Sequence, residues 1–279
     1  TAFAFTPEKI ALLSAYILDG SQWLAHGPHT DFGAEGREIT RPQQTALYLG
    51  RAARDMLRVV TGREDEFRAL AARIDEAPAA PPLIGNKHFP CSDIMAHHGR
   101  GWYMSARMYS TRTMNTDNLA GCGEGHLSHY LAEGATCIMR HGGEYINLFP
   151  AWDWQRVPGT TVELEPHKTG DPQRRGESPF SGGASDGTTG VAAFQLQRGS
   201  LRARKAWFFF SDLAVCLGAD ICCATGHPVV TTLNQCRLRG PVTVGGDTGS
   251  RVAVDGSGTF DVRWLWHDGI AYLFAKSTP

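Results

Sequence analysis

The spacing of apolar residues in this chain changes at a proline-rich stretch that runs from Ala77 to Pro82. Before this stretch, Ile10, Leu13 and Ile17 recur at the intervals that place residues on one face of a helix. After it, the residues from Trp102 to Tyr109 alternate as they do in a strand. The two periods belong to different elements, so the chain needs a helical region and a separate β region. We predict a multidomain α+β fold, which is helical over 1–76, has a linker over 77–85 stiffened by proline, and is a β domain over 86–279.

Three helices are expected in the first region, and several strands in the second. The helices begin at Pro7, span Gln43–Val60 and span Glu64–Ile74, with an irregular segment over Gly27–Pro42 between the first two. Short strand-like runs punctuated by Gly, Asp, Asn and Ser predict an antiparallel sheet domain. These runs are 102–109, 192–196, 206–210, 214–217, 229–233, 242–244 and 260–266.

Bulk composition excludes some partners and says little about others. The formal net charge of the 279 residues is -1, which gives no electrostatic reason to expect nucleic-acid or membrane binding. No run of eighteen apolar residues is present, so no membrane-spanning helix is expected. The seven cysteines are odd in number and lack zinc-site spacing, and we expect most of them to be buried free thiols, with Cys216 and Cys236 in apolar strands.

The segment from Glu144 to Thr161 combines aromatic residues, prolines and a Gly-Thr-Thr turn. It reads EYINLFPAWDWQRVPGTT, which fits neither a periodic helix nor a simple strand. An ordered, aromatic-lined loop of this kind can grip sugar rings, although tryptophan serves core packing more often. Trp152 and Trp154 would share one face of an extended loop, and we expect them to face a sugar or to pack the loop.

Together with four other segments in the same order, this loop resembles the family 8 polysaccharide lyases, the group of chondroitin AC, hyaluronate and xanthan lyases. The four segments are GREITRP at 36–42, GGASDGTTG at 182–190, KAWFFFSDLAVCL at 205–217 and TTLNQ at 231–235. The last two are most similar to the chondroitin AC lyase branch. The resemblance implies the last helices of an α/α toroid followed by an incomplete, galactose-mutarotase-like β-sandwich. It also implies a secreted or periplasmic enzyme whose N-terminal part is missing here or exists as a separate chain.

Arg37 and Arg41 form the arginine pair of the motif Gly-Arg-x-x-Ser/Thr-Arg, and the resemblance implies that both contact substrate. Two guanidiniums can clamp a uronate carboxylate, because each presents a planar fork of donors. Neutralising that carboxylate acidifies the neighbouring C5 proton, which must leave in β-elimination. From the residues alone, surface arginines that cap helix carbonyls remain the alternative.

Asp117 and Glu124 lie in a stretch that resembles the family's acidic loop, which reaches from the β domain into the cleft. Glu124 matches the last acidic position, whereas Asp117 matches the first only with a shift of one residue. The family's loop asparagine would fall near Cys122, which departs from the family's pattern at this substrate contact. Ordinary loop acids are the alternative interpretation.

The residues expected to transfer the proton have no match in this sequence. The resemblance implies a tyrosine that acts as base and then acid, assisted by a histidine and an asparagine. His26, in DGSQWLAH, is similar to the catalytic histidine stretch, but no tyrosine lies between Asp19 and Arg41. We therefore interpret His26 as structural or solvated, and we expect the chain by itself to lack turnover.

A structural calcium ion is expected on the same grounds, near Asp153, Glu163 and Glu165. Oxygen ligands suit calcium, but Gln155 occupies a position where an acid is expected, which removes a charge. No further cofactor is expected, since the sequence has neither a phosphate-binding loop nor a dinucleotide fingerprint.

The function that the resemblance implies is β-elimination of acidic, uronate-containing glycosaminoglycans, chiefly chondroitin sulfate and hyaluronan. Xanthan lyase activity is one alternative, because that branch shares the fold. A non-catalytic carbohydrate-binding fragment is the other, and the missing histidine and tyrosine favour it.

Overall fold

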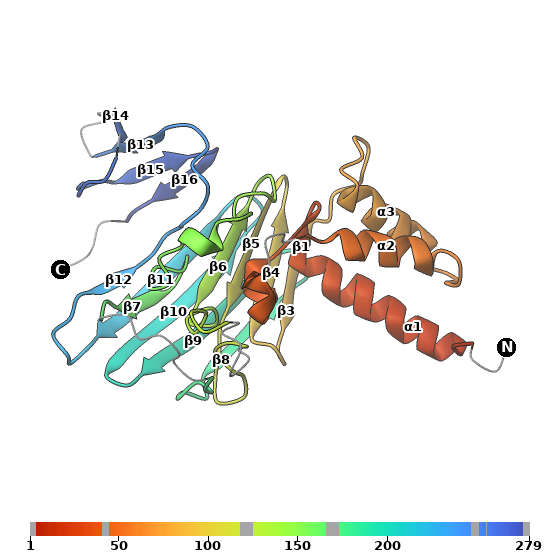
Figure 1. The fold of residues 1–279 in the computed structure, drawn as a ribbon, viewed down its shortest axis with the longest axis horizontal. Coiled ribbons are helices and arrows are strands. Elements are labelled where there is room, and N and C mark those ends of the chain that lie inside the picture. Colours follow the sequence, from red (N-terminus) through yellow and green to blue (C-terminus); the bar gives the residue numbers. More distant parts are fainter. Residues whose placement is uncertain are drawn as a thin grey trace. The chain divides into compact units, whose positions relative to one another are not determined.

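The computed structural model describes residues 4–40, 45–117, 125–165, 173–246, 251–254 and 256–275. Its contacts divide the chain into a large unit, Thr1–Gln235, and a small one, Cys236–Pro279. The division therefore follows Gln235 and does not fall in the predicted linker over 77–85. In the large unit, three helices stand beside two β-sheets (Figure 1).

The helices pack through one apolar stripe each. α1 (Pro7–Ala15) begins with proline in its first turn and continues into a π turn, Tyr16–Gly20, and a 3₁₀ turn, Ser21–Leu24. α2 (Leu47–Met56) lies against α3 (Glu64–Ile74), whose bounds confirm the prediction. α2 is shorter than the predicted Gln43–Val60, whose first two residues lie outside the described chain. None of the helices in the described ranges combines the length and the apolar character that a membrane crossing needs.

The two larger sheets of this unit are antiparallel and share one core, which bears out the predicted antiparallel β region. The first runs in the order β3-β4-β5-β6, and the second in the order β11-β10-β9-β8. Apolar side chains from both sheets meet between them, among them Met95, Met104, Phe194 and Trp207. The strands are β3 (Gly85–Phe89), β4 (Ile94–Gly99), β5 (Trp102–Arg107), β6 (Ala135–Met139), β8 (Ser181–Ser185), β9 (Gly190–Arg198), β10 (Leu201–Phe209) and β11 (Ala214–Cys222).

Two short pairings complete the large unit. β1 (Ala25–His26) and β2 (His29–Thr30) form a hairpin directly after the first helical segment. β7 (Thr161–Glu163) pairs with β12 (Val229–Thr231), so the end of the aromatic loop is joined to the segment TTLNQ.

The small unit is a four-stranded antiparallel sheet in the order β14-β13-β15-β16. Its strands are β13 (Val242–Gly245), β14 (Arg251–Val254), β15 (Trp264–His267) and β16 (Ile270–Leu273). His267 fastens the entry of this unit, because its Nε2 accepts a hydrogen bond from the backbone N of Arg239 at 3.2 Å.

The expected burial of the cysteines is wrong for most of those described. The six described cysteines are free thiols, as expected, but only Cys137 among them is buried. Cys216 is exposed because β11 is an edge strand, and Cys236 is half-buried. Apolar neighbours along the sequence therefore did not indicate a buried strand, since an edge strand carries the same residue types.

Candidate functional site

Arg37 lies on a segment of two consecutive 3₁₀ turns that follows β2. The turns are Phe32–Ala34 (η3) and Gly36–Thr40 (η4). Asp31 begins the first turn, since its Oδ1 accepts a hydrogen bond from the backbone N of Gly33 at 2.7 Å. Gly36 separates the turns with a φ of +59°, a conformation that glycine adopts without strain.

The structure brings Arg37 to Asp117, eighty positions along the chain. The Nη1 of Arg37 lies 3.2 Å from Oδ2 and 3.4 Å from Oδ1 of Asp117. The two side chains are 40% and 48% exposed, so the guanidinium is held by a carboxylate while part of it faces solvent. Gly36 permits this approach, because a Cβ there would lie 3.1 Å from the Cβ of Asp117. Arg41 and Glu124, the other two residues predicted for this cleft, lie outside the described residues.

A polar cluster lies beneath the Arg37 segment, and no sequence motif identified it. The Tyr103 hydroxyl, on β5, donates a hydrogen bond to Oδ2 of Asp31 at 2.7 Å, and both residues are almost fully buried. Arg107, four residues along β5, donates through Nη1 to the carbonyl oxygen of Gly33. The one available signal was Asp31 two residues before Gly33, a spacing that suits a capping carboxylate.

Of the two roles expected for Trp152, facing a sugar or packing the loop, the structure supports packing. Trp152 is 6% exposed and lies in an aromatic cluster, with ring centroids 5.2 Å from Phe32 and 4.7 Å from Phe149. Its Nε1 donates a hydrogen bond to the carbonyl oxygen of Gln235 at 2.9 Å. The loop turns at a short 3₁₀ segment, Phe149–Ala151 (η5), so it is not extended and Trp152 points inward. Trp154 is half-buried at the edge of this cluster, which leaves part of its ring accessible.

Asn234 and Gln235 anchor this loop, which gives a structural role to the segment TTLNQ. Oδ1 of Asn234 accepts a hydrogen bond from the Tyr145 hydroxyl at 2.9 Å. The side chain of Gln235 accepts from the backbone N of Asp153 at 2.8 Å and donates to the Asp153 carbonyl at 3.1 Å. The aromatic loop is therefore fixed at both ends, to the first sheet and to the segment after β12.

The three residues expected to hold calcium make separate contacts. Asp153 pairs with Arg156 at 3.1 Å, and Glu163 accepts hydrogen bonds from Cys223 at 3.1 Å and from Thr225. The backbone carbonyl of Glu165 accepts from Gln155 at 2.6 Å. Among the described residues, these carboxylates do not gather within reach of one ion. The residues present thus do not fit a calcium site in this arrangement, and no step of the chemistry is assigned to a metal.

A cavity of about 300 Å³ opens beside Glu163. Its wall includes Tyr130, Arg174, Arg198 and His227, so charges of both signs line it. Arg174 is joined to the segment before Asp117, because its backbone N donates to Oδ1 of Asn115 at 2.9 Å. One residue of the cavity wall is thus joined to Asn115, two positions before Asp117.

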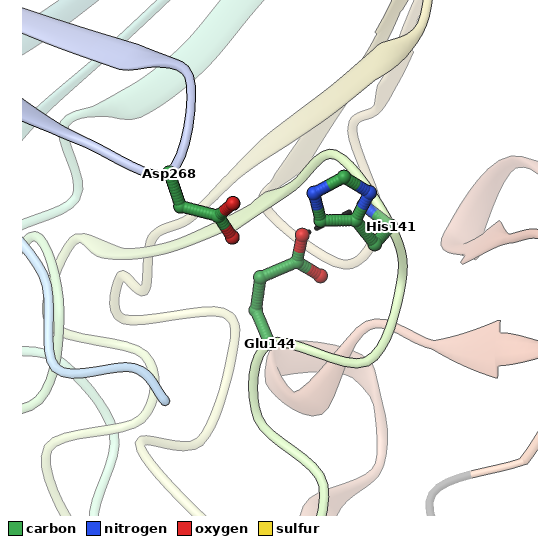
Figure 2. A group of neighbouring side chains, drawn as sticks. All are labelled: His141, Glu144 and Asp268. Carbon is green, nitrogen blue, oxygen red and sulfur yellow. Dashed lines mark hydrogen bonds between the residues drawn. The ribbon is translucent and has the colours of Figure 1, made fainter. Parts of the chain in front are cut away.

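Glu144 closes the turn that follows β6. Its Oε1 accepts a hydrogen bond from the backbone N of Arg140 at 2.8 Å. The same oxygen accepts one from the backbone N of His141 at 2.7 Å (Figure 2). Asp268, also drawn in Figure 2, belongs to the small unit, where it occupies the turn between β15 and β16 with a φ of +46°.

His26 is engaged in packing. Its Nε2 lies 3.2 Å from the carbonyl oxygen of Arg140, and its ring stacks on Tyr103 with centroids 6.3 Å apart. Burial lowers the pKa of His26 below its usual value, which favours the neutral ring. These contacts agree with the interpretation of His26 as a structural residue.

The chain is similar to known proteins over nearly its whole length. Residues 84–279 match the model of the polysaccharide lyase family 8 super-sandwich domain. The chain is 36% identical to chondroitinase-AC of Pedobacter heparinus over 290 residues, covering 99% of this chain and 40% of that protein. It is 32% identical to hyaluronate lyase of Thermasporomyces composti over 62% of this chain and 24% of that protein.

A solved structure of chondroitinase AC lyase in complex with oligosaccharides is similar over 98% of this chain and 41% of its own length. The TM-score is 0.88 and the sequence identity is 33%. The chain thus spans well under half the length of the relatives it matches.

Proposed function

The chain belongs to polysaccharide lyase family 8, and we propose that it takes part in β-elimination of uronic-acid glycosaminoglycans, chiefly chondroitin sulfate and hyaluronan. The observation that carries the proposal is Arg37, whose half-exposed guanidinium is held by Asp117. The likeness to a chondroitinase-AC and a hyaluronate lyase supports this choice of polymer.

In the proposed reaction, Arg37 binds the uronate carboxylate at the sugar C5. A guanidinium donates two parallel hydrogen bonds to a carboxylate, and the added positive charge stabilises the carbanion that forms when the C5 proton leaves. The bond between C4 and O4 then breaks, the sugar linked through O4 departs, and a double bond forms between C4 and C5. Asp117 aims the guanidinium before substrate arrives, which reduces the ordering that binding must impose.

The proton-transferring residues of the family have no match in this sequence, so we assign to this chain the carboxylate-binding side of the cleft. We further propose that α1, α2 and α3 correspond to the last helices of an α/α toroid, and that the two large sheets begin a galactose-mutarotase-like sandwich. A secreted or periplasmic location follows as part of the proposal, since polymers of this size do not cross membranes.

Turnover and binding test the proposal separately. We expect Arg37→Ala to weaken calorimetrically measured binding of chondroitin sulfate at least tenfold, because a hydrogen bond to a charged group contributes roughly 1.5–3 kcal/mol. Arg54→Ala is the matched control, since Arg54 and Asp75 form a similarly exposed pair at 2.8 Å between α2 and α3. Equal affinity of Arg37→Ala and the native chain would refute the clamp.

A second candidate function is carbohydrate binding without turnover, favoured by the missing proton-transferring residues. Ultraviolet absorbance of the unsaturated uronate product, with chondroitin sulfate, hyaluronan and xanthan tested in parallel, shows whether the chain alone carries turnover. If no product forms, binding that is independent of Arg37 favours the second candidate. Product from chondroitin sulfate supports a lyase that is complete in this chain. Binding that depends on Arg37, without product, supports a chain that supplies one side of the cleft, and product from xanthan alone would transfer the proposal to that branch.

A further inference from the structure

The buried residues Asp31 and Tyr103 and the half-buried Arg107, together called the Asp31 cluster below, join the Arg37 segment to β5. Each oxygen of the Asp31 carboxylate has its own donor, the Gly33 backbone N on one side and the Tyr103 hydroxyl on the other, both at 2.7 Å. Arg107 adds a third link through the Gly33 carbonyl. The first 3₁₀ turn is therefore fastened at its backbone N and at its backbone O, four residues before Arg37.

The contacts of Arg107 reach the backbone that carries Arg37. Its guanidinium donates to the Gly33 carbonyl, four residues before Arg37. Burial lowers the pKa of this guanidinium, and the negative charges of Asp31 and Asp117 act in the opposite direction. The geometric link of the Asp31 cluster to Arg37 therefore runs through the first 3₁₀ turn.

We propose that Asp31, Tyr103 and Arg107 are positioning residues for the Arg37 guanidinium, an inference that rests on the function proposed above. Arg37 is a long side chain with 40% exposure, and Asp117 holds its guanidinium. Its direction also depends on the η4 backbone, which directly follows the turn that the Asp31 cluster fastens. A clamp held in this way binds a carboxylate with less loss of conformational entropy.

A matched pair of tyrosines allows a direct test. Tyr103→Phe removes the hydroxyl that donates to buried Asp31 and preserves the ring. Tyr109→Phe removes the same group from another buried tyrosine, whose hydroxyl donates to buried Glu133 at 3.3 Å. We expect Tyr103→Phe to weaken binding of a chondroitin sulfate oligosaccharide roughly threefold to tenfold, and Tyr109→Phe to leave it unchanged.

The decisive measurement is whether the effect of Tyr103→Phe on affinity depends on Arg37. If Tyr103 acts through the guanidinium, Tyr103→Phe has no further effect on affinity in an Arg37→Ala background. A loss of the same size in that background, or an equal loss from Tyr109→Phe, would overturn the inference, because a general loss of stability would explain it. Should Tyr103→Phe fail to fold, Asp31→Asn serves instead, since its amide offers one acceptor oxygen where the carboxylate offers two.

Amide hydrogen exchange separates failure of this inference from failure of the proposed function. We expect Tyr103→Phe to accelerate exchange at the amides of residues 33–39, and Tyr109→Phe not to do so. If the native chain binds no polysaccharide, the proposed function fails, and faster exchange still supports the positioning of Arg37. If exchange at 33–39 is unchanged in Tyr103→Phe, the Asp31 cluster does not hold the segment and the inference is overturned.

Discussion

Lys205 is a buried cation on β10. Its Nζ donates a hydrogen bond to the carbonyl oxygen of Gly159, and its side chain lies near the ring of Trp207, with Nζ 5.5 Å from the centroid. Burial lowers the pKa of Lys205 to about 8. A charged amine in such a place disfavours folding at neutral pH, because the unfolded chain keeps it in water.

The pH dependence of stability should reveal this group. In the unfolded chain Lys205 stays protonated up to about pH 10.5, so between pH 8 and 10.5 the folded state binds fewer protons. Stability relative to Lys205→Met should therefore rise with pH across this window, by roughly 3 kcal/mol. Urea denaturation of both proteins at pH 7 and 10 measures it. A pH-independent difference between them would show that Lys205 titrates normally.

The buried residue His98 should make the stability of the fold depend on pH on the acidic side. It is buried on β4, its Nε2 lies 3.1 Å from the Trp23 carbonyl oxygen, and burial lowers its pKa to about 3. The unfolded chain takes up this proton near pH 6.5, so stability is lost as pH falls from 6.5 towards 3. His98→Gln can keep a donor without the titration, and its urea midpoint should fall less than that of the native protein between pH 7 and 4.5. Equal falls in both would contradict the assignment.

Among single residues, the sequence identifies charged residues that lie in recognisable motifs. It does not identify residues whose role depends on burial in the folded protein. Arg37 was identified because its motif is local, whereas its pairing with Asp117 was not predicted. Tyr103 and Arg107 stand in an ordinary strand pattern. The contact of Tyr103 with Asp31 and that of Arg107 with Gly33 depend on tertiary packing. The sequence left two roles open for Trp152 for the same reason, since only the folded loop shows the aromatic cluster that buries it.

β4 is a strand that the sequence pattern did not predict. Every residue of β4 is buried, so the alternation that marks a half-exposed strand is absent. His97 lies against Phe209 on one face, and His98 lies against Trp23 and Tyr103 on the other. The two adjacent histidines thus occupy the middle of a strand that is covered on both sides.

The aromatic loop depends on Gly159, which has a φ of +82°. A Cβ at this position would lie 2.5 Å from Thr136 Oγ1 and 2.6 Å from the Gly134 carbonyl oxygen, a backbone atom that cannot move freely. Gly159→Ala should therefore destabilise the protein by about 2–4 kcal/mol in thermal or urea denaturation.

Gly226 is the matched control for this substitution. Its φ is +83°, yet nothing lies within 4 Å of a Cβ placed there. Gly226→Ala should cost about 1 kcal/mol, from backbone strain alone. Equal losses of stability in the two variants would mean that the close contact at Gly159 has no energetic weight.

We predict that the small unit, which follows Gln235, does not fold by itself. Among the described side chains of the small unit, Val244 is the one buried apolar residue. A core of this size is too small for the segment to fold alone. A peptide of residues 236–279 should be unfolded by circular dichroism, whereas a chain that ends at Gln235 should unfold cooperatively. A folded peptide would contradict this view of its core.

The change of apolar period across Ala77–Pro82 correctly predicted helices followed by antiparallel sheets, because both periods are local properties of the chain. The division between units escaped prediction, since it depends on which strands share a core. The pairing of β7 with β12 likewise joins segments far apart in sequence, and no local pattern specifies it.

The central claim is that Arg37 binds the uronate carboxylate, and calorimetry with two polymers tests it most directly. Chondroitin and carboxyl-reduced chondroitin differ only in that group. We expect the native chain to bind chondroitin at least tenfold more tightly than the reduced polymer, and Arg37→Ala to bind both alike. Equal binding of both polymers by the native chain, or an undiminished preference in Arg37→Ala, would contradict the account.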